Sequence, residues 1–154
     1  FQEMCFVHRD FHASNIMVKN KKFGLIDSQD ALRGNLLYDV ASLIDDVRIK
    51  LPIKLKSSLF SYYLSKTSKI KNNTEKLLAQ NDFDILSVQR NLKILGIFVR
   101  LFKRDHKLSY LKYLPYIWEL LELRLKNPIF INLKYLLNKA VPIKNRKKVK
   151  FNDN

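Results

Sequence analysis

Glycine is scarce in this chain of 154 residues, which contains only Gly24, Gly34 and Gly96. Loops that hold the phosphates of a nucleotide are rich in glycine, because their backbone N–H groups must approach the phosphate oxygens closely. Three glycines this far apart cannot form a G-x-G-x-x-G or Walker loop. If the chain handles a nucleotide, the loop over the phosphates must come from other residues.

Cysteine and long apolar runs are also rare. Cys5 is the only cysteine, which excludes an intrachain disulfide and is typical of a reducing compartment. Its apolar neighbours predict a buried thiol. No run approaches the roughly 20 apolar residues that span a bilayer, and no signal-peptide pattern opens the chain. We therefore expect a cytoplasmic protein without a membrane partner.

Acidic residues are few, with 14 Asp and Glu against 29 Lys and Arg, for a formal net charge of +15. The excess is uneven, because residues 1–46 hold seven acids and five bases, a net of −2, so residues 47–154 carry +17. Clustered bases attract polyanions. Lysines placed at solvent positions by a general bias in composition would give the same count, so the charge alone does not separate these explanations.

One motif carries recognisable chemistry. Residues 8–15, His-Arg-Asp-Phe-His-Ala-Ser-Asn, match H-R-D-x-x-x-x-N, the pattern of a kinase catalytic loop, and Asp27 follows twelve residues after Asn15. Phosphoryl transfer needs a carboxylate that accepts the proton of the attacking hydroxyl, and oxygen ligands that hold Mg²⁺ against the phosphates. We assign Asp10 as the catalytic base and Asn15 and Asp27 as metal ligands.

Local patterning predicts how these residues meet. Residues 4–7 are a short apolar run typical of a buried strand, and residues 15–18 and 23–26 are two more, separated by Lys-Asn-Lys-Lys, which indicates a β-hairpin. Asn15 then begins one strand, and Asp27 follows the end of the other. Both metal ligands should therefore emerge at one end of the hairpin.

The remaining patterns predict helices, so we expect a mainly α fold with a small β-hairpin. Gly34 and Asn35 indicate a turn. Apolar spacing, Asp82 as an N-cap and the prolines predict helices over residues 38–49, 52–66, a short stretch to 79, 82–104, 108–126 and 128–138. Pro115 either starts or kinks the helix over residues 108–126. Residues 139–154 contain six bases and one acid and are expected to form a flexible tail.

Further segments extend the pattern of the loop. They are Ile-Asp-Ser-Gln-Asp at 26–30, Tyr-Asp-Val-Ala-Ser-Leu at 38–43, residues 89–98, and the region of Leu114, Pro115 and Trp118. Together with the loop they resemble the aminoglycoside phosphotransferase and choline kinase superfamily, over nearly the whole chain to about residue 138. The likeness is greatest to bacterial kinases of the cell-wall sugars N-acetylmuramate and N-acetylglucosamine. Those kinases usually have Asp-Phe-Gln-Asp at this point, from which Ser28 departs.

The resemblance implies a protein-kinase-like fold. Residues 1–138 would be its C-terminal catalytic lobe, with the loop and hairpin in residues 1–34 and a helical subdomain in residues 35–138. It also implies ATP as donor, Mg²⁺ as cofactor and the anomeric hydroxyl of an amino sugar as acceptor, in the recycling of cell-wall fragments. The N-terminal lobe, with its glycine-rich loop and lysine–glutamate ion pair, would lie upstream of Phe1.

Other side chains near the base have several candidate roles. His8 is usually structural in such loops, where its side chain anchors the backbone. Arg9 could steady a phosphate or pair with an acid, and His12 could contact the substrate or be a packed histidine. Asp30 could bind a sugar hydroxyl or brace the loop.

Candidate residues also lie further along the chain. Asp39 opens a predicted helix and is expected to fix local structure, either by capping that helix or by bonding loop amides. Arg90 and Asn91 lie on a largely apolar helix, where buried polar groups need partners. We therefore expect both to face the substrate cleft, with Arg90 as a candidate substrate ligand.

Three alternatives stay open on the sequence. A kinase of the same superfamily could act on an aminoglycoside, choline, homoserine or another small alcohol. A basic helical nucleic-acid-binding protein would explain the charge, but most aromatics here fall on apolar stripes rather than among exposed bases. A kinase fold without activity is disfavoured by the intact set of Asp10, Asn15 and Asp27.

We predict that the 154-residue chain alone binds ATP weakly and has negligible kinase activity, because positioning dominates phosphoryl transfer and requires both lobes. Calorimetric titration with MgATP and a coupled ADP-release assay on the purified chain measure the two quantities. Turnover in the range of about 1–100 s⁻¹, typical of kinases, would contradict the prediction.

Overall fold

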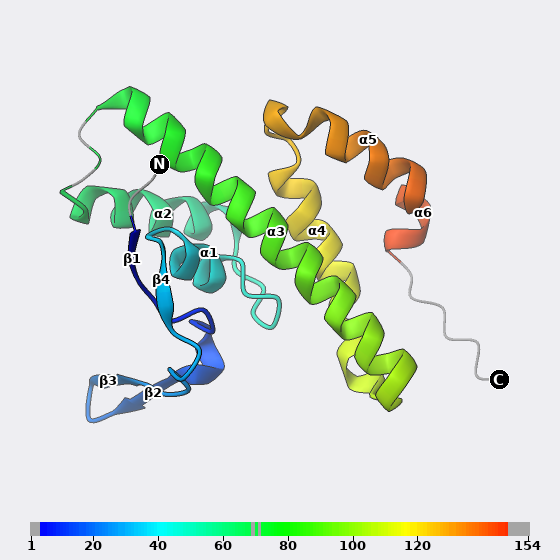
Figure 1. Ribbon diagram of the computed structural model, residues 1–154, viewed down its shortest axis with the longest axis horizontal. Coiled ribbons are helices and arrows are strands. Elements are labelled where there is room, and N and C mark those ends of the chain that lie inside the picture. The colour runs from blue at the N-terminus through cyan, green and yellow to red at the C-terminus, as the bar shows by residue number, and fades with distance from the viewer. Residues whose placement is uncertain (1–3, 69, 71, 148–154) are drawn as a thin grey trace. The chain divides into compact units, whose positions relative to one another are not determined.

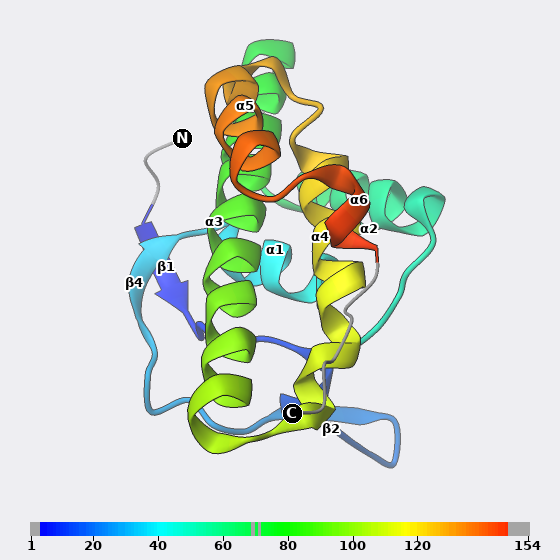
Figure 2. The ribbon, with the colours of Figure 1, turned by 90° about the vertical axis from the view of Figure 1, so that its right-hand side faces the viewer.

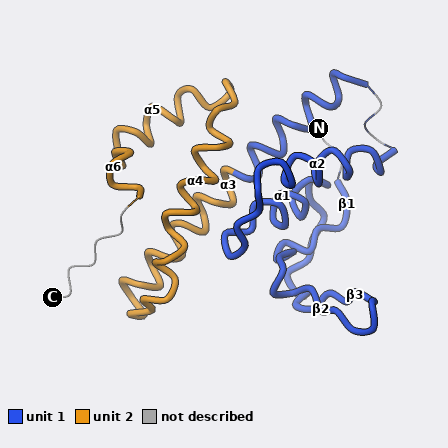
Figure 3. Tube along the Cα trace, turned by 180° about the vertical axis from the view of Figure 1, so that it is seen from behind, with its two compact units in different colours: residues 1–87 blue, residues 88–154 orange. Residues whose placement is uncertain are grey.

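The computed structural model describes residues 4–68, 70 and 72–147 of the chain. The protein divides into two compact units, Phe1–Ser87 and Val88–Asn154, which are coloured separately in Figure 3. The boundary between them falls inside the long helix α3, Asn73–Asp105. The fold is mainly helical with small antiparallel sheets, as the sequence predicted.

The predicted hairpin is confirmed in the first unit (Figure 1). It consists of β2, Ile16–Lys19, and β3, Lys22–Leu25, paired antiparallel. The two residues between the strands, Asn20 and Lys21, have φ of 50° and 61°. A two-residue turn with both residues in the left-handed region matches the right-handed twist of the strands.

A second sheet was not predicted. It pairs β1, Met4–Val7, with β4, Leu32–Asn35, so Gly34 lies in a strand and not in the expected turn. A Cβ atom on Gly34 would lie 3.1 Å from Cγ2 of Val7, so the missing side chain permits close packing within the ladder. The chain turns two residues later, where Leu37 N donates to Asn35 Oδ1 at 2.9 Å.

Two short helices follow the sheets and build the core of the first unit. They are α1, Tyr38–Ile44, and α2, Ile53–Lys66, which begins directly after Pro52 as predicted. The rings of Phe60 on α2 and Phe83 on α3 pack with their centroids 4.5 Å apart. The buried residues of this core are Leu36, Leu37, Ala41, Ile44, Phe60, Ile70, Ala79 and Phe83.

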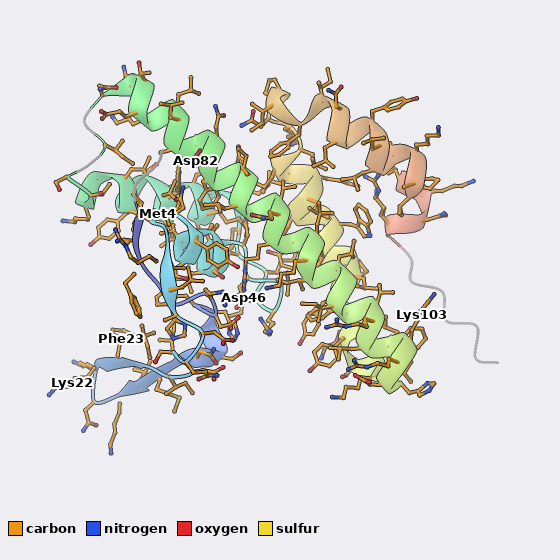
Figure 4. The ribbon with its side chains drawn as sticks, in the orientation of Figure 1. Met4, Lys22, Phe23, Asp46, Asp82 and Lys103 are labelled. Atoms are coloured by element: carbon orange, nitrogen blue, oxygen red, sulfur yellow. The ribbon has the colours of Figure 1, made fainter. Side chains whose placement is uncertain are left out.

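Helix α3 corrects the prediction of two helices separated before Asp82. Its start is set at Asn72, whose Oδ1 accepts from Glu75 N at 2.9 Å while Glu75 Oε2 accepts from Asn72 N at 3.3 Å. This reciprocal capping box satisfies two donors that a helix start leaves open. Asp82, labelled in Figure 4, lies within the helix and accepts from Asn35 Nδ2 at 3.2 Å. A tertiary contact therefore takes the place of the expected cap.

The second unit contains the later part of α3 and a series of short helices, seen in Figure 2. After the 3₁₀ segment Leu108–Tyr113 come α4, Leu114–Arg124, the 3₁₀ turn Pro128–Phe130, α5, Ile131–Ala140, and α6, Ile143–Arg146. Pro115 lies in the first turn of α4 and so starts that helix, while the first part of the predicted helix over residues 108–126 is 3₁₀. Pro128 opens a 3₁₀ turn that leads directly into α5. The buried side chains of α4 form the centre of this unit: Leu114, Ile117, Trp118, Leu120 and Leu121.

The expected flexible tail is wrong for its first residues. Arg146 in α6 is only 3% exposed, and its guanidinium lies 4.5 Å from the ring centroid of Trp118. Arg146 also donates to Val141 O at 2.9 Å and to Asn138 Oδ1 at 2.8 Å. These contacts hold α6 against α4, which a sequence reading based on charge does not reveal. Residues 148–154 of the predicted tail lie outside the described residues.

No helix in the described part of the chain is both long and apolar enough to cross a membrane.

A buried ion pair follows the end of α1, which stops at Ile44 and not at residue 49 as expected. Lys56 Nζ donates to Asp45 Oδ1 at 2.8 Å and to Ile44 O at 2.6 Å. Ser87 Oγ donates to the other oxygen of Asp45 at 2.5 Å. Because Lys56 takes one of the last carbonyls of α1, the pair also completes the end of that helix.

We predict that Lys56→Met lowers the free energy of unfolding by about 3–5 kcal/mol, because it leaves the buried carboxylate of Asp45 without its cation. Lys54→Met is the control, since Lys54 is exposed on the same helix, and it should change stability by no more than about 0.5 kcal/mol. Urea unfolding followed by circular dichroism compares them. Equal effects of the two substitutions would show that the ion pair adds nothing.

Candidate functional site

Two strand pairings bring the predicted site residues together. β1 pairs with β4, and β2 pairs with β3. The loops formed by residues 8–15 and 26–31 both run between these two pairings, so each loop is held at both of its ends. Ile26 N donates to Asn15 O at 3.1 Å, which extends the hairpin ladder by one bond. The loop that carries Asp10 therefore lies beside the loop that begins at Asp27.

The carboxylate of Asp39, in the first turn of α1, anchors the start of the first loop. Its Oδ2 accepts from His8 N at 2.7 Å, and its Oδ1 accepts from Arg9 N at 3.0 Å. Arg9 has φ of 71°, a conformation that is costly for a residue with a side chain. Asp39 thus stabilises a strained backbone immediately before Asp10.

The imidazole of His8 ties the first loop to the second. His8 is 2% exposed, and its Nε2 lies 3.0 Å from Ile26 O. A carbonyl oxygen only accepts hydrogen bonds, so Nε2 carries the proton. Ile26 directly precedes Asp27. The bond therefore sets the distance between the loop with the candidate base and the loop with a candidate metal ligand.

The side chain of Asn15 closes the first loop on itself. Asn15 Nδ2 donates to Asp10 O at 3.0 Å, and the same carbonyl accepts from His12 N at 3.0 Å. Because the amide nitrogen is used in this bond, the side-chain oxygen of Asn15 is the atom left for a cation. Asp10 itself is partly exposed. Its carboxylate is therefore accessible to a substrate.

Asp27 lies two residues beyond β3 and is exposed, with φ of 68°. Its Oδ1 accepts from Gln29 Nε2 at 2.6 Å, which leaves its other oxygen. Among the described residues, no three of His, Cys, Asp and Glu form a metal-binding group. An oxygen from Asn15 and a carboxylate from Asp27 nevertheless suit Mg²⁺, which binds few protein ligands and completes its octahedron with water and phosphate. The donor set fits the ion.

The other predicted residues of the two loops differ in their contacts and in their exposure. Arg9 Nη1 donates to the backbone carbonyl of Asp30 at 3.3 Å, so Arg9 bonds the main chain of the second loop. The side chain of Asp30 is exposed, and His12 is half-buried. All three lie in the loops that the strand pairings hold, and their roles toward a substrate stay predictions.

Arg90 and Asn91 lie on the part of α3 that belongs to the second unit. Both are buried, with exposed fractions of 8% and 0%. Arg90 Nε has no hydrogen-bond partner among the described residues. Whether Arg90 serves as a substrate ligand stays a prediction, because only the residues of the first unit are brought together by the contacts above.

Asp46 was missed by the sequence reading, although it holds the same loop. It is 3% exposed, its Oδ2 accepts from Ala13 N at 3.3 Å, and its Oδ1 accepts from Arg48 N at 3.0 Å. Figure 4 labels its side chain. The available signal was a pair of adjacent acids at the end of an apolar helix, where buried carboxylates need donors. Asp39 and Asp46 thus hold the loop on either side of Asp10.

An apolar cavity of about 460 Å³ adjoins the loop and is lined by Phe11, Asp39 and Tyr63 among others. Cys5 also lines it and is half-buried, so the expected buried thiol is corrected. Tyr63 donates its hydroxyl to Leu36 O at 3.1 Å. Burial raises the pKa of Tyr63, with smaller contributions from Cys5 and Asp39. The Tyr63 hydroxyl bonds Leu36 O, and the other walls of the cavity are largely apolar. Few polar groups there compete with the loop amides for the carboxylate of Asp39.

Comparison with known proteins adds a family to this geometry. The phosphotransferase enzyme family matches residues 2–74, which include both loops and Asp39. The chain is 34% identical over 125 residues to the N-acetylmuramate/N-acetylglucosamine kinase of Pseudomonas aeruginosa, an alignment that covers 79% of this chain and 36% of that protein.

Kinases of the same name from other bacteria are also similar. The protein of Caulobacter vibrioides is 28% identical over 147 residues, covering 92% of this chain and 39% of the relative. The protein of Neisseria meningitidis is 34% identical over 116 residues, covering 74% of this chain and 35% of the relative. The chain thus spans little more than a third of the length of these relatives. On this match, residues 2–74 belong to the phosphotransferase enzyme family, and the chain as a whole is similar to these kinases.

Proposed function

We propose that this chain forms the base and metal-ligand part of an ATP-dependent phosphotransferase site that acts on a hydroxyl of an amino sugar. The observation that carries the proposal is the anchoring of the loop around Asp10. Asp39 accepts the amides of His8 and Arg9 at 2.7 and 3.0 Å, and His8 bonds the residue before Asp27. These bonds hold the partly exposed carboxylate of Asp10 between two anchored segments, and a general base must be held within reach of the hydroxyl whose proton it accepts.

The proposed chemistry assigns one task to each side chain. Asp10 accepts the proton of the sugar hydroxyl as its oxygen attacks the γ-phosphorus of ATP, and the bond from that phosphorus to the bridging oxygen of ADP breaks. Asn15 and Asp27 hold Mg²⁺. The ion would neutralise charge on the transferred group and on the leaving phosphates. His8 and Asp39 act by positioning, since both hold the backbone around Asp10.

The amino sugar is supported by the relatives. The similar proteins of three bacteria are all called N-acetylmuramate/N-acetylglucosamine kinase. Among the hydroxyls of such a sugar we propose the anomeric one as acceptor, as the resemblance of the loops implies. The product would be a sugar 1-phosphate, which suits the reuse of cell-wall fragments. An aminoglycoside, choline or homoserine acceptor is the rival within the same family.

The nucleotide requires residues beyond those described. The three glycines are too dispersed for a phosphate loop, and the matched relatives are almost three times as long as the aligned part. We propose that an N-terminal nucleotide-binding lobe elsewhere in the protein covers the phosphates. The hairpin supports this, because it exposes apolar side chains that such a lobe could cover: Met17, Val18, Phe23 and Leu25. Phe23 is 78% exposed and is labelled in Figure 4.

A substrate panel tests the proposal. The intact protein is incubated with MgATP and, in turn, N-acetylmuramate, N-acetylglucosamine, kanamycin, choline and homoserine, and ADP release is measured. We expect the two amino sugars to give a kcat/KM at least about 100-fold above the others, because a site that bonds a sugar's polar groups rejects analogues lacking them. Phosphorus NMR of the product identifies the phosphorylated hydroxyl. Activity on choline or kanamycin alone would replace the amino sugar as acceptor.

Asp10→Asn, measured in the same assay, tests whether Asp10 is the base. The amide keeps the shape of the carboxylate but accepts no proton at neutral pH, so we expect kcat to fall by about 100-fold or more. Nucleotide affinity, measured by titration with MgATP, should stay within about threefold of the unsubstituted protein, because the metal ligands are unchanged. A variant with normal turnover would remove Asp10 as the base.

Asp39→Asn tests the anchoring of the loop. The amide offers one acceptor and turns its NH₂ group toward a backbone N–H, so one of the two bonds is lost. We expect kcat to fall by about 10-fold to 100-fold, because small displacements of reacting groups are costly. Asp105→Asn is the control, since its carboxylate pairs only locally with Arg104 at 2.6 Å on the surface. Equal kcat in the two variants would contradict a positioning role for Asp39.

A further inference from the structure

Helix α5 presents an apolar face to solvent. None of its residues is buried, and Ile131, Tyr135 and Leu136 are 73%, 68% and 59% exposed. Successive residues of a helix are rotated by about 100°, so these three side chains occupy one arc of about 140°. The flanking Ile129 and Ile143 are 48% and 52% exposed. Exposed apolar side chains that gather in this way, and are not scattered singly, mark an interaction site.

The segment that contains α5 is basic. Its residues 123–152 include no Asp or Glu. Five lysines of the segment are exposed, namely Lys126, Lys134, Lys139, Lys144 and Lys147. On α5 itself, the same helical spacing places Lys139 within the apolar arc and Lys134 about 60° outside it. The face therefore combines apolar side chains with positive charge.

We propose that the face of α5 formed by Ile131, Tyr135 and Leu136, with the exposed lysines of the surrounding segment, binds the surface of an anionic phospholipid bilayer. A helix with this composition lies in the interface, with its apolar side chains at the boundary of the acyl chains and its lysines among the headgroup phosphates. Such binding needs no spanning segment. The expectation of no membrane partner rested only on the lack of such a segment.

Charge and side-chain type favour the bilayer over other partners. A second copy of this face would oppose lysines with lysines, which is unfavourable. Nucleic acid would use the lysines, but branched aliphatic side chains contribute little to a strand that is bound through phosphates and stacked bases, and Tyr135 is the aromatic residue of this arc. A lipid surface uses both the aliphatic side chains and the positive charge.

The test is sedimentation of the intact protein with vesicles of phosphatidylcholine, with and without phosphatidylglycerol. We expect binding to the anionic vesicles only, and its loss at high salt, because screening weakens the attraction of the lysines. Lys134→Glu with Lys139→Glu should weaken the partition coefficient by at least about 25-fold, because losing each lysine near the surface costs about fivefold and each glutamate is repelled as well. Ile131→Ser with Tyr135→Ser should weaken it by about tenfold or more.

Matched controls separate this face from general surface properties. Lys103→Glu with Lys107→Glu changes the charge equally at exposed positions elsewhere in the second unit. Ile53→Ser with Tyr62→Ser removes comparable side chains from α2, where they are 64% and 63% exposed. Both controls should bind vesicles within about twofold of the unsubstituted protein, because peripheral binding depends on residues close to the lipid. Circular dichroism of every variant verifies that the protein is folded.

Several results would overturn the proposal. They are absence of binding to anionic vesicles, equal losses in the α5 variants and their controls, and binding that is stronger to generic RNA than to vesicles. Self-association that Ile131→Ser with Tyr135→Ser abolishes in the absence of lipid would assign the face to a second copy. Phosphotransferase activity is measured separately, so failure of either proposal leaves the other unaffected.

Discussion

The pairing of β1 with β4 is the constraint on which the site depends. It joins the strand before the first loop to the strand after the second, while the hairpin of β2 and β3 joins the other ends of the same loops. Loop ends that are fixed by backbone hydrogen bonds lose little further entropy when their side chains form contacts. Without the pairing of β1 with β4, the second loop, residues 26–31, would be fixed only at its start, and Asp27 would be held less firmly beside Asn15. Gly34 favours this pairing, because a Cβ atom there would lie only 3.1 Å from Cγ2 of Val7.

Carboxylates then do what the strands cannot, because loop amides have no partners within a ladder. The half-buried Asp39 and the buried Asp46 accept amides from residues 8, 9 and 13 of the loop, and the buried Asp45 binds Lys56 and Ser87. A buried carboxylate is stable only if it is bonded, and an amide in a strained turn is stable only if it is held. The loop and α1 therefore stabilise each other, and the partly exposed carboxylate of Asp10 lies where it can contact a substrate. The proposed base and metal ligands would thus need little reorganisation to act.

Features set by local interactions could be read from the sequence, and features set by distant residues could not. The hairpin was predictable because its apolar runs and polar turn are adjacent. The helical starts next to Pro52, at Leu114 with Pro115, and at Pro128 follow from the fixed φ of the proline ring. The strand role of Gly34 was missed, because the residue it approaches, Val7, lies far away in the sequence. Asp82 was predicted to cap a helix, but in the structure it accepts a hydrogen bond from Asn35, which is distant in the sequence. The loop motif was recognisable because phosphoryl transfer requires its residue types at fixed spacing.

The sequence by itself determined the chemistry offered by the chain: a carboxylate five residues before an amide, a second carboxylate at the end of a hairpin, and a basic segment without acids over residues 123–152. It also determined the helical character of most of the chain, because periodicity and proline act over a few residues. Only the tertiary structure decided that Asp39 and Asp46 hold the loop, that Arg146 packs on Trp118, and that the apolar side chains of α5 face solvent. The physical reason is that hydrogen bonding and burial depend on which residues meet in space. A side chain's type limits its possible partners, and the fold selects among them.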